Sequence, residues 1–285
     1  MKARYNDGAG HSLMLYGKPG EVLEVLRGMQ RRCKCHEATI AEVRRPAEKA
    51  GETDWATVLR VCRDGLAKRV YTVGETLTAE HSTLGRIVWR ICRVDEDRLV
   101  LVATKPVCSM VFDEGEKEES EDGEPNPKRY RKYGYNRWEE SAVRQWLNSA
   151  EGAGEWWKPQ NDWDTEPDCH GKVAGFMAGF GKAFLACVRE SEITTASEDG
   201  NGGYTTRDRF YLPSITEVFG EANAGVAEGE KLDLGEDFCK VHCCWWLRSP
   251  HVGVAYFVYN VTSSGSSNIT YAFFTSGAVP ACVIG

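Results

Sequence analysis

The sequence has 285 residues, of which 42% are hydrophobic and 27% charged, a composition typical of a chain that buries a core. It carries 42 acidic and 35 basic residues, a formal net charge of −7, which disfavours nucleic-acid binding. It has no apolar run of the roughly 18 residues that a membrane span needs, and its first residues lack an apolar signal-peptide core. We therefore expect synthesis in the cytoplasm and reduced thiols for the 11 cysteines.

Residues 1–70 are expected to form a small helical and β appendage separate from the rest of the chain. Ser12–Tyr16 is predicted as a strand, Pro19 as the start of an amphipathic helix, and the charged residues 31–53 as a linker. A second helix is expected to begin with Thr53 as its N-cap residue. The apolar face of this helix comprises Trp55, Val58, Leu59, Cys62 and Leu66. We interpret the unit as a docking or packing element.

The middle of the chain alternates predicted strands and helices around one acidic segment. Strands are predicted at Val70–Val73, Ile87–Val94, Leu99–Thr104, Ile193–Ala196 and Arg209–Leu212. Helices are predicted at Glu139–Asn148 and Gly171–Arg189. The segment Asp113–Glu124 is so rich in acidic residues that self-repulsion predicts a solvated or disordered insertion, placed at 113–128. Val226–Asp237 is polar and predicts a loop.

The C-terminal part differs from the rest, because no charged residue follows Arg248. The segment from Ser249 to Gly285 instead mixes tyrosine and phenylalanine with serine, threonine, asparagine and glycine. Antibody-like paratopes have this chemistry, in which rigid aromatic rings supply contact area and small polar groups adapt their hydrogen bonds. The segment is therefore a candidate binding surface.

Residues 251–278, here called the variable tract, also lack lysine, glutamate, glutamine, methionine and tryptophan. These five amino acids are the ones that an AAC codon cannot encode after its adenines are randomised. A plain Gly/Ser-rich β-segment would share part of this bias. The pattern nevertheless indicates a surface that has been mutagenised at adenines.

Four motifs together resemble those of a known family. They are Trp138–Asn148, Arg209–Val218, Cys244–Pro250 and Gly277–Ile284. The last two resemble the frame around the variable region of diversity-generating retroelement target proteins, and the first two are similar to the middle of the DUF6273 domain family. The resemblance covers about Val70 to Gly285. It implies an α+β, C-type lectin fold, shared with formylglycine-generating enzymes, for residues 71–285, with a variable region at about 245–285.

The resemblance implies a ligand-binding display protein that is not an enzyme and holds neither cofactor nor metal. In this family a reverse transcriptase copies a template repeat with errors at adenines, and the copy replaces the variable region. Display would occur on a virion, often at the tail, or on a cell surface. The partner would be a variable protein or glycan ligand on a host or neighbouring cell. Neither nucleic acid nor membrane insertion is expected, and the N-terminal region would serve virion attachment or homo-oligomerisation.

If the tract varies, framework residues must supply the core, because core changes destabilise far more than exposed ones. The residues assigned to framework packing are Trp245, Trp246, Leu247, Val258, Val261, Ala272, Pro280, Ala281 and Val283. Arg248 is expected to pair inside the protein, the alternative being a ligand contact. Gly265 and Gly277 are expected at turns with positive φ.

Fourteen residues of the tract, here called the display positions, are predicted to contact the ligand. They are His251, Val252, Val254, Tyr256, Phe257, Tyr259, Thr262, Ser264, Asn268, Ile269, Thr270, Tyr271, Phe273 and Phe274. Several apolar residues would then be exposed together, which marks an interaction site. Strand alternation leaves one alternative open for Phe257, Phe273 and Phe274, which is burial in the core.

Other patterns suggest different functions but are less specific. Glu124-Pro125-Asn126 spells a sugar-specifying triplet of calcium-dependent lectins, yet it lies in the acidic insertion, and Asn161-Asp162-Trp163 has the wrong order for its companion motif. His170 and His242 show no catalytic partner in the sequence. The clusters Cys33–His36 and Cys239–Cys244 lack the paired ligand arms of a zinc site.

Two further functions are kept as alternatives. A cysteine oxidase of the formylglycine-generating type would need copper held by a cysteine pair, for example Cys244 with Cys282. A structural virion or scaffold protein would instead use the variable tract as an oligomer interface.

Overall fold

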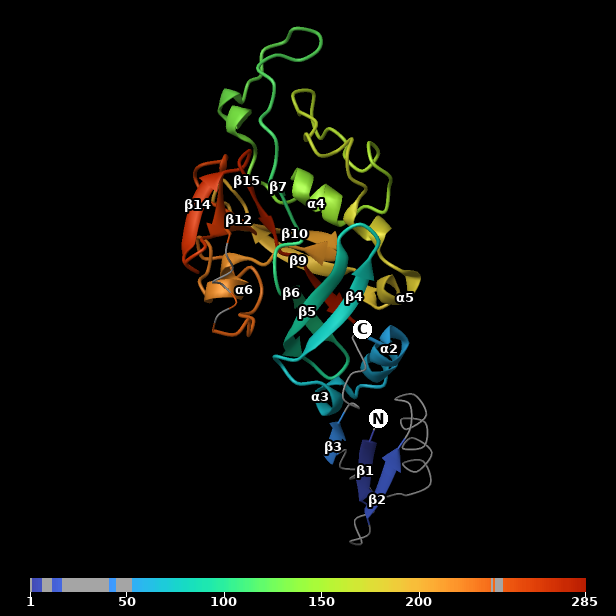
Figure 1. The fold of residues 1–285 in the computed structure, drawn as a ribbon. Helices are drawn as coiled ribbons and strands as arrows, with labels where there is room; N and C mark the ends of the chain where they lie inside the picture. Colours follow the sequence, from blue (N-terminus) through green and yellow to red (C-terminus); the bar gives the residue numbers. More distant parts are fainter. Residues whose placement is uncertain (1, 7–11, 17–40, 45–52, 237, 239–242) are drawn as a thin grey trace.

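The computed structural model describes residues 2–6, 12–16, 41–44, 53–236, 238 and 243–285. These residues form a mixed α/β protein built mainly from antiparallel sheets (Figure 1). The expected helix from Pro19 and the first cysteine cluster lie outside them. Strand β2 (Ser12–Tyr16) confirms the first predicted strand and pairs with β1 (Lys2–Asn6). Strand β3 (Ala41–Arg44) pairs with β1 on its other side, so the expected linker contains a strand.

The largest sheet carries most of the core and orders its strands β11-β16-β6-β5-β4, with β8 also paired to β16. Its strands are β4 (Thr76–His81), β5 (Gly85–Val94), β6 (Leu99–Ala103), β8 (Val188–Arg189), β11 (Phe210–Tyr211) and β16 (Ala281–Ile284). Strand β6 is buried at every residue, as its unbroken apolar sequence requires. Strand β16 pairs with β6, so the end of the chain completes this sheet.

A second sheet contains the three strands of the variable tract and has the order β14-β13-β12-β15-β7. Its strands are β7 (Cys108–Val111), β12 (Trp245–Pro250), β13 (Phe257–Val261), β14 (Ser267–Tyr271) and β15 (Thr275–Ala278). Strands β13 and β14 form an antiparallel hairpin, with β14 at the sheet edge. Strands β12 and β15 pair in parallel. In Figure 1 the hairpin lies far from the N-terminal sheet. A separate pair, β9 (Ser191–Ala196) with β10 (Gly203–Asp208), surrounds the glycine-rich turn.

The described helices are short. They are α2 (Trp55–Arg63), α3 (Ala67–Val70), η1 (Arg129–Tyr133), α4 (Ala142–Leu147), η2 (Phe176–Gly179), α5 (Lys182–Leu185) and α6 (Ile215–Phe219). None of the helices described here is both long and apolar enough to cross a membrane. Helix α2 packs on the core through Trp55, whose ring centroid lies 4.5 Å from that of Phe184.

The N-cap of α2 is Asp54 and not Thr53, because Asp54 Oδ1 accepts a hydrogen bond from the Thr57 backbone N–H at 3.2 Å. The Thr53 hydroxyl is used elsewhere, since it accepts from the Thr78 N–H at 2.8 Å. The predicted strand at Val70–Val73 is also wrong. Helix α3 ends at Val70, and the strand that follows, β4, had no prediction.

The predicted helix Gly171–Arg189 is replaced by η2, α5 and β8. Its glycines explain the error, because they allow close packing of the backbone. A Cβ atom at Gly179 would lie 2.1 Å from the His81 ring, and one at Gly175 would lie 2.4 Å from the Ser149 carbonyl oxygen. These tertiary contacts override the helical pattern of the apolar residues.

The remaining differences concern the boundaries of elements and elements for which there was no prediction, such as β7 and α6. The helix expected from Glu139 begins only after the N-cap Ser141, whose hydroxyl accepts from the Arg144 N–H. The strand expected at Arg209–Leu212 shrinks to the two residues of β11, and β10 before it was not predicted.

The acidic insertion is only partly solvated. Lys117–Glu119 and Glu121–Glu124 are exposed, but Glu116 is buried. The Glu116 carboxylate accepts hydrogen bonds from Arg131 at 3.0 Å and from the Asn126 amide at 2.8 Å. The prediction is therefore wrong for the first part of the segment, which packs against η1.

Candidate ligand-binding surface

The variable tract lies between two buried strands that belong to different sheets. Strand β12 precedes it in the second sheet, and β16 follows it in the largest sheet, and both strands are buried along their whole length. The framework residues Trp245, Trp246, Leu247, Val258, Val261, Ala272, Pro280, Ala281 and Val283 are all buried, as predicted. The Trp246 indole also donates to the Met110 carbonyl at 2.9 Å, which links β12 to β7 across the intervening strand β15.

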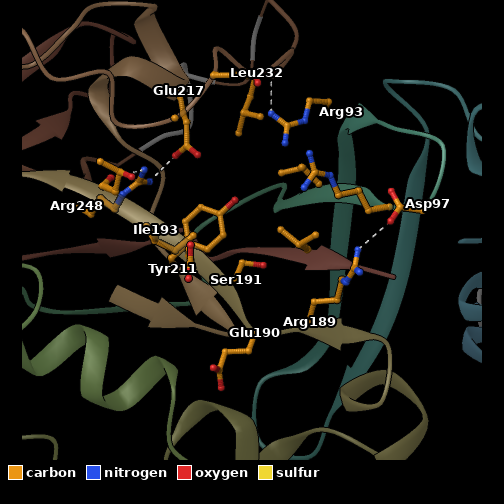
Figure 2. Close-up of a pocket in the computed structure, with 17 residues that line it drawn as sticks. Arg93, Asp97, Arg189, Glu190, Ser191, Ile193, Tyr211, Glu217, Leu232 and Arg248 are labelled. Carbon is orange, nitrogen blue, oxygen red and sulfur yellow. Dashed lines mark hydrogen bonds and ion pairs between the residues drawn. The ribbon is translucent and has the colours of Figure 1, made fainter. Parts of the chain in front are cut away.

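The expected internal pairing of Arg248 is confirmed. Arg248 as a whole residue is 1% exposed. Its guanidinium donates to Glu217 Oε2 at 2.5 Å and to the Leu212 carbonyl at 2.8 Å (Figure 2). Glu217 belongs to α6 and forms the capping box of that helix with Ser214. A buried cation that is paired and hydrogen-bonded in this way ties β12 to α6.

The next two residues of β12 are held by the loop after α6. The buried Glu228 carboxylate accepts from the Ala196 N–H at 2.8 Å and from the Ser249 hydroxyl. Burial raises the pKa of Glu228 above its ordinary value. The Asn223 amide donates to the Pro250 carbonyl at 2.9 Å. The polar loop predicted at Val226–Asp237 thus supports the strand from which the variable tract begins.

The first loop of the tract is fixed by Asn136, which is fully buried. The Asn136 amide nitrogen lies within hydrogen-bond distance of three main-chain carbonyls, those of His251 (3.3 Å), Val254 (3.0 Å) and Phe257 (2.8 Å). Its backbone N–H donates to the Ala255 carbonyl at 2.8 Å. Because these acceptors are backbone atoms, the loop shape does not depend on which side chains the tract carries.

The β13–β14 hairpin presents alternate residues on opposite faces. Its cross-strand pairs are Phe257–Tyr271, Val258–Thr270, Tyr259–Ile269 and Asn260–Asn268. Val258 and Asn260 are buried, so the pairs that contain them face inward, and the pairs of Phe257 and Tyr259 face outward. Asn268 and Thr270 therefore lie on the opposite face of the edge strand from Ile269 and Tyr271, where Asn268 is exposed and Thr270 half-buried.

None of the fourteen display positions is buried. Ser264, Asn268 and Phe274 are exposed, and the other eleven are half-buried. Phe274 is 47% exposed, the largest value among the big hydrophobic side chains that the structure describes. The alternative in which Phe257, Phe273 or Phe274 belongs to the core does not hold for Phe274, while Phe257 and Phe273 are covered only in part.

Six aromatic side chains form one group on this face, here called the aromatic cluster. They are Tyr133, Tyr256, Phe257, Tyr271, Phe273 and Phe274. The ring centroids of Tyr256 and Tyr271 are 5.7 Å apart and the rings are stacked. Those of Phe257 and Tyr271 are 4.8 Å apart, as are those of Phe273 and Phe274. An apolar group of this kind that is partly open to solvent marks a binding surface.

Tyr133 is the member of this cluster that sequence reasoning missed. It belongs to η1, outside the variable tract, and its ring centroid lies 5.0 Å from that of Tyr271 and 5.4 Å from that of Tyr256. The Phe273 N–H donates to the Tyr133 carbonyl at 3.2 Å. Gly134 has φ +84°, and a Cβ atom there would lie 2.8 Å from the Phe273 nitrogen, so only glycine allows this approach.

The other end of the surface adjoins the β9–β10 turn. The Gly253 N–H donates to the Glu198 carbonyl at 2.8 Å. The Glu198 carboxylate accepts from the Tyr135 hydroxyl at 2.5 Å and from Arg137 at 3.2 Å. Burial, together with this carboxylate, raises the pKa of Tyr135, so its phenol stays neutral.

The two framework glycines differ. Gly265 has φ +88° and occupies the turn between β13 and β14, as expected. Gly277 lies within β15 and is not among the glycines with positive φ, so that prediction is wrong. A Cβ atom at Gly277 would lie 2.8 Å from Pro106, and this close approach explains the glycine.

The fold brings together the two motifs that resemble a calcium-lectin site. Trp163 Nε1 donates to the Glu124 carbonyl at 3.2 Å, and the Asn161 amide donates to Glu116 Oε1 at 3.1 Å. Asn126 is buried and donates to the same Glu116 carboxylate. These side-chain amides thus donate to acceptors of the protein itself. Among the residues that the structure describes, no three His, Cys, Asp or Glu side chains lie close enough together to hold a metal ion.

The two histidines and the cysteine pair named above have different environments. His170 Nδ1 lies 2.6 Å from Glu166 Oε1, a partner that the sequence could not show, and His242 lies outside the described residues. Cys282 is fully buried in β16, and burial raises its pKa well above the ordinary value. Cys244 is exposed and precedes β12 in the other sheet. The two thiols therefore do not form one exposed pair.

Comparison with protein-family models gives a match to the C-terminal part of the chain. Residues 111–285, which include the aromatic cluster and the whole variable tract, match the family described as a domain of unknown function, DUF6273. No curated protein and no solved structure matches the chain. Because the match covers more than half of the sequence, the chain belongs to the DUF6273 family.

Proposed function

We propose that the protein is a ligand-binding display protein in which the variable tract forms an exchangeable recognition surface. One observation carries this proposal: none of the fourteen display positions is buried, while the strands that flank the tract are buried along their whole length. Exposed substitutions change stability far less than buried ones. Such a surface can therefore change while the core stays the same.

The chemistry of the surface supports a macromolecular ligand. Exposed aromatic rings are the side chains that dominate binding energy at many protein interfaces, and they also stack on sugar rings. The tract adds hydroxyl and amide groups and no charge. A protein or glycan on a host or neighbouring cell fits this combination, with display on a virion tail or a cell surface.

We further propose that a retroelement diversifies the tract, within a domain of the C-type lectin type. Three features support this: the missing amino acids of residues 251–278, the Cys244–Pro250 and Gly277–Ile284 motifs around them, and the main-chain contacts of Asn136, which do not depend on tract side chains. Together they suit a loop that must keep its shape while its sequence changes.

The DNA that flanks the gene tests diversification. A second copy of the sequence that encodes the tract, differing mainly at adenines and lying near a reverse transcriptase gene, is expected. If neither element is present, diversification is wrong, and a fixed binding surface is the only form of the proposal left.

Paired libraries test the surface itself. In one library nine of the display positions are randomised with codons that end in C, and in the other the nine framework residues are randomised with the same codons. Most display variants should fold, and selection on purified proteins and glycans should yield binders. If the display library unfolds as often as the framework library, the proposal is wrong.

A further inference from the structure

Strand β14 forms one edge of the second sheet, since it pairs with β13 and with no other described strand. Figure 1 shows it on the outside of the molecule. In an antiparallel pair, opposite residues alternate between those that exchange main-chain hydrogen bonds and those that do not. Two bonds just beyond the hairpin strands fix this alternation. The Ala272 N–H donates to the Tyr256 carbonyl at 3.0 Å, and the Thr262 N–H donates to the Ser266 carbonyl at 2.8 Å.

The alternation leaves main-chain groups of β14 unpaired at the sheet edge. The hairpin register has no irregularity, so steps of two residues from both bonds place Asn268 and Thr270 in the hydrogen-bonded pairs. The N–H and C=O groups of Ser267, Ile269 and Tyr271 therefore point away from β13. Of these groups, the Tyr271 carbonyl alone has a hydrogen-bond partner in the described part of the chain. Ser267 and Ile269 thus present a row of unpaired donors and acceptors.

This edge has none of the features that normally keep a strand from pairing with another chain. Its sequence Ser-Asn-Ile-Thr-Tyr contains no charged residue and no proline, and its register has no bulge. Two other edge strands are partly covered by protein groups. The Thr78 N–H of β4 donates to the Thr53 hydroxyl at 2.8 Å, and the Thr194 carbonyl of β9 accepts from Arg248 at 3.3 Å. The β14 edge is therefore suited to accept a further strand.

Main-chain pairing selects a peptide as the ligand and suits a surface whose side chains change. The outward groups of Ser267 and Ile269 are two residues apart, about 6.8 Å along the strand, which is the repeat of an extended peptide. A glycan has no matching row of alternating donors and acceptors. Every residue except proline offers the same main-chain groups, so an added strand keeps its hydrogen bonds when the tract changes.

A lysine beside this edge indicates which peptide fits. Lys132 of η1 is exposed, and its Nζ lies 5.2 Å from the centroid of the Tyr133 ring, which in turn lies 5.0 Å from that of Tyr271. The neighbouring Arg131 is ion-paired, whereas Lys132 forms no ion pair among the described residues. An acidic side chain next to Tyr271 would supply its partner. A second copy of β14 would not, because that strand has no acidic residue and each copy carries a net charge of −7.

We propose that an extended segment of a protein ligand adds to the β14 edge as a further strand, with an acidic side chain beside Lys132. Hydrogen bonds to the main chain of Ser267 and Ile269 hold the segment, and the aromatic cluster next to it selects the side chains. This inference rests on the proposed function, because it names the class of ligand for the same surface.

Hydrogen exchange in the full-length protein, followed by NMR, tests the unpaired edge. The Ser267 and Ile269 amides should exchange at least about tenfold faster than those of Asn268 and Thr270. Random ten-residue peptides selected on the immobilised protein are then the probes for binding. Selected peptides should be rich in Asp and Glu, and their binding should slow exchange at Ser267 and Ile269 about tenfold or more. Methylation of the peptide nitrogens should weaken binding at every second residue and not at the residues between.

Two pairs of variants locate the contact. Ile269→Pro removes the outward N–H without a bond to β13, and it should bind the peptides about tenfold more weakly than Ile269→Ala, which lacks the same side chain but keeps the N–H. Lys132→Gln should weaken binding about threefold or more, while Lys182→Gln, at an exposed lysine of α5, should not. The methylated peptides leave the protein unchanged, so they test the added strand even if Ile269→Pro folds poorly.

The results separate this inference from the proposed function. Equal exchange of the four β14 amides, or peptides that bind without protecting Ser267 and Ile269, would overturn the added strand. Wild-type affinity in Lys132→Gln would overturn the acidic contact. A dimer of the wild type that Ile269→Pro separates would assign the edge to a second copy of the chain and overturn the inference. In each case the surface could still bind other ligands, whereas a surface that binds no peptide, protein or glycan would overturn both proposals.

Discussion

Arg248 Nη1 lies 2.5 Å from Glu217 Oε2, and the two side chains form an ion pair. No Asp, Glu, Lys or Arg follows Arg248 in the sequence. Both side chains are buried, and the pair links the strand that begins the variable region to helix α6. Residues 249–285 carry no charged side chain, so no side chain within them can form an ion pair that holds the variable region in place. The pair belongs to the framework, and its loss should affect folding before it affects recognition.

Removal of one partner of this pair should be costly. Arg248→Gln leaves the Glu217 carboxylate buried without its cation, and we expect a loss of about 3–5 kcal/mol in the free energy of unfolding. Urea denaturation measures this loss. Arg207→Gln, at an exposed pair with Glu192, is the matched control and should change stability by less than about 1 kcal/mol. Similar losses in the two variants would show that Arg248 has no special framework role.

Asn136 should control the shape of the first loop of the tract. Asn136→Ala removes the amide donor from three carbonyls, with an expected cost of about 1–3 kcal/mol. The His251 N–H, which donates to the Phe257 carbonyl at 2.9 Å, should exchange with solvent faster in this variant. Hydrogen exchange measures the change, and Asn201→Ala, in the exposed β9–β10 turn, is the control. Unchanged protection at His251 would contradict the role given to Asn136.

Display and framework positions should differ sharply in tolerance. Phe274→Ser, at the most exposed ring of the aromatic cluster, should alter the free energy of unfolding by no more than about 0.5 kcal/mol. Val258→Ser, at a fully buried residue of β13, should cost at least about 2 kcal/mol, because it removes apolar contacts and buries a hydroxyl. Chemical denaturation of the two variants gives the comparison. Equal costs would remove the distinction on which the proposed function rests.

The framework residues could be predicted because they stand in short stretches of sequence whose apolar pattern itself indicates burial. Leu99–Ala103 is an unbroken apolar run, and the buried residues of β12 and β16 lie in short apolar segments beside the uncharged tract. Arg248 followed from the same reasoning, since a lone charge in such a segment must be paired when it is buried. The absence of charged residues after Arg248 also indicated which part of the chain forms the candidate binding surface.

Features that depend on contacts between distant segments could not be predicted. Tyr133 joins the aromatic cluster only because Gly134 lets η1 approach Phe273. The helix expected at Gly171–Arg189 is broken where Gly179 packs under His81. The partners of Glu228 come from three separate segments, so nothing in its own polar loop indicated that it is buried.

The pH dependence of stability should reveal Asp113. Burial, with the neighbouring Asp164 carboxylate, raises the pKa of Asp113 well above its ordinary value. The folded state then holds the proton more tightly than the unfolded state. The stabilisation from this group is therefore complete below the ordinary carboxyl pKa of about 4 and is lost as the pH rises through the folded value.

The free energy of unfolding should therefore decrease less between mildly acidic and neutral pH in Asp113→Asn than in the wild type. Urea denaturation at a series of pH values measures the slope. Asp122→Asn, at an exposed carboxylate of the same acidic segment, is the control and should keep the wild-type slope. Parallel curves for wild type and Asp113→Asn would show that this carboxyl does not titrate as described.

The variable tract should serve recognition and not assembly. In the double variant Tyr256→Ser/Tyr271→Ser the stacked pair at the centre of the aromatic cluster is lost, while the framework contacts of Asn136 and Arg248 are kept. We expect the mass in solution, measured by light scattering, to equal that of the wild type, because an exchangeable surface cannot also hold subunits together. A change of mass confined to this variant, and not seen with the exposed control Tyr130→Ser in η1, would instead favour a scaffold protein whose oligomer interface is the tract.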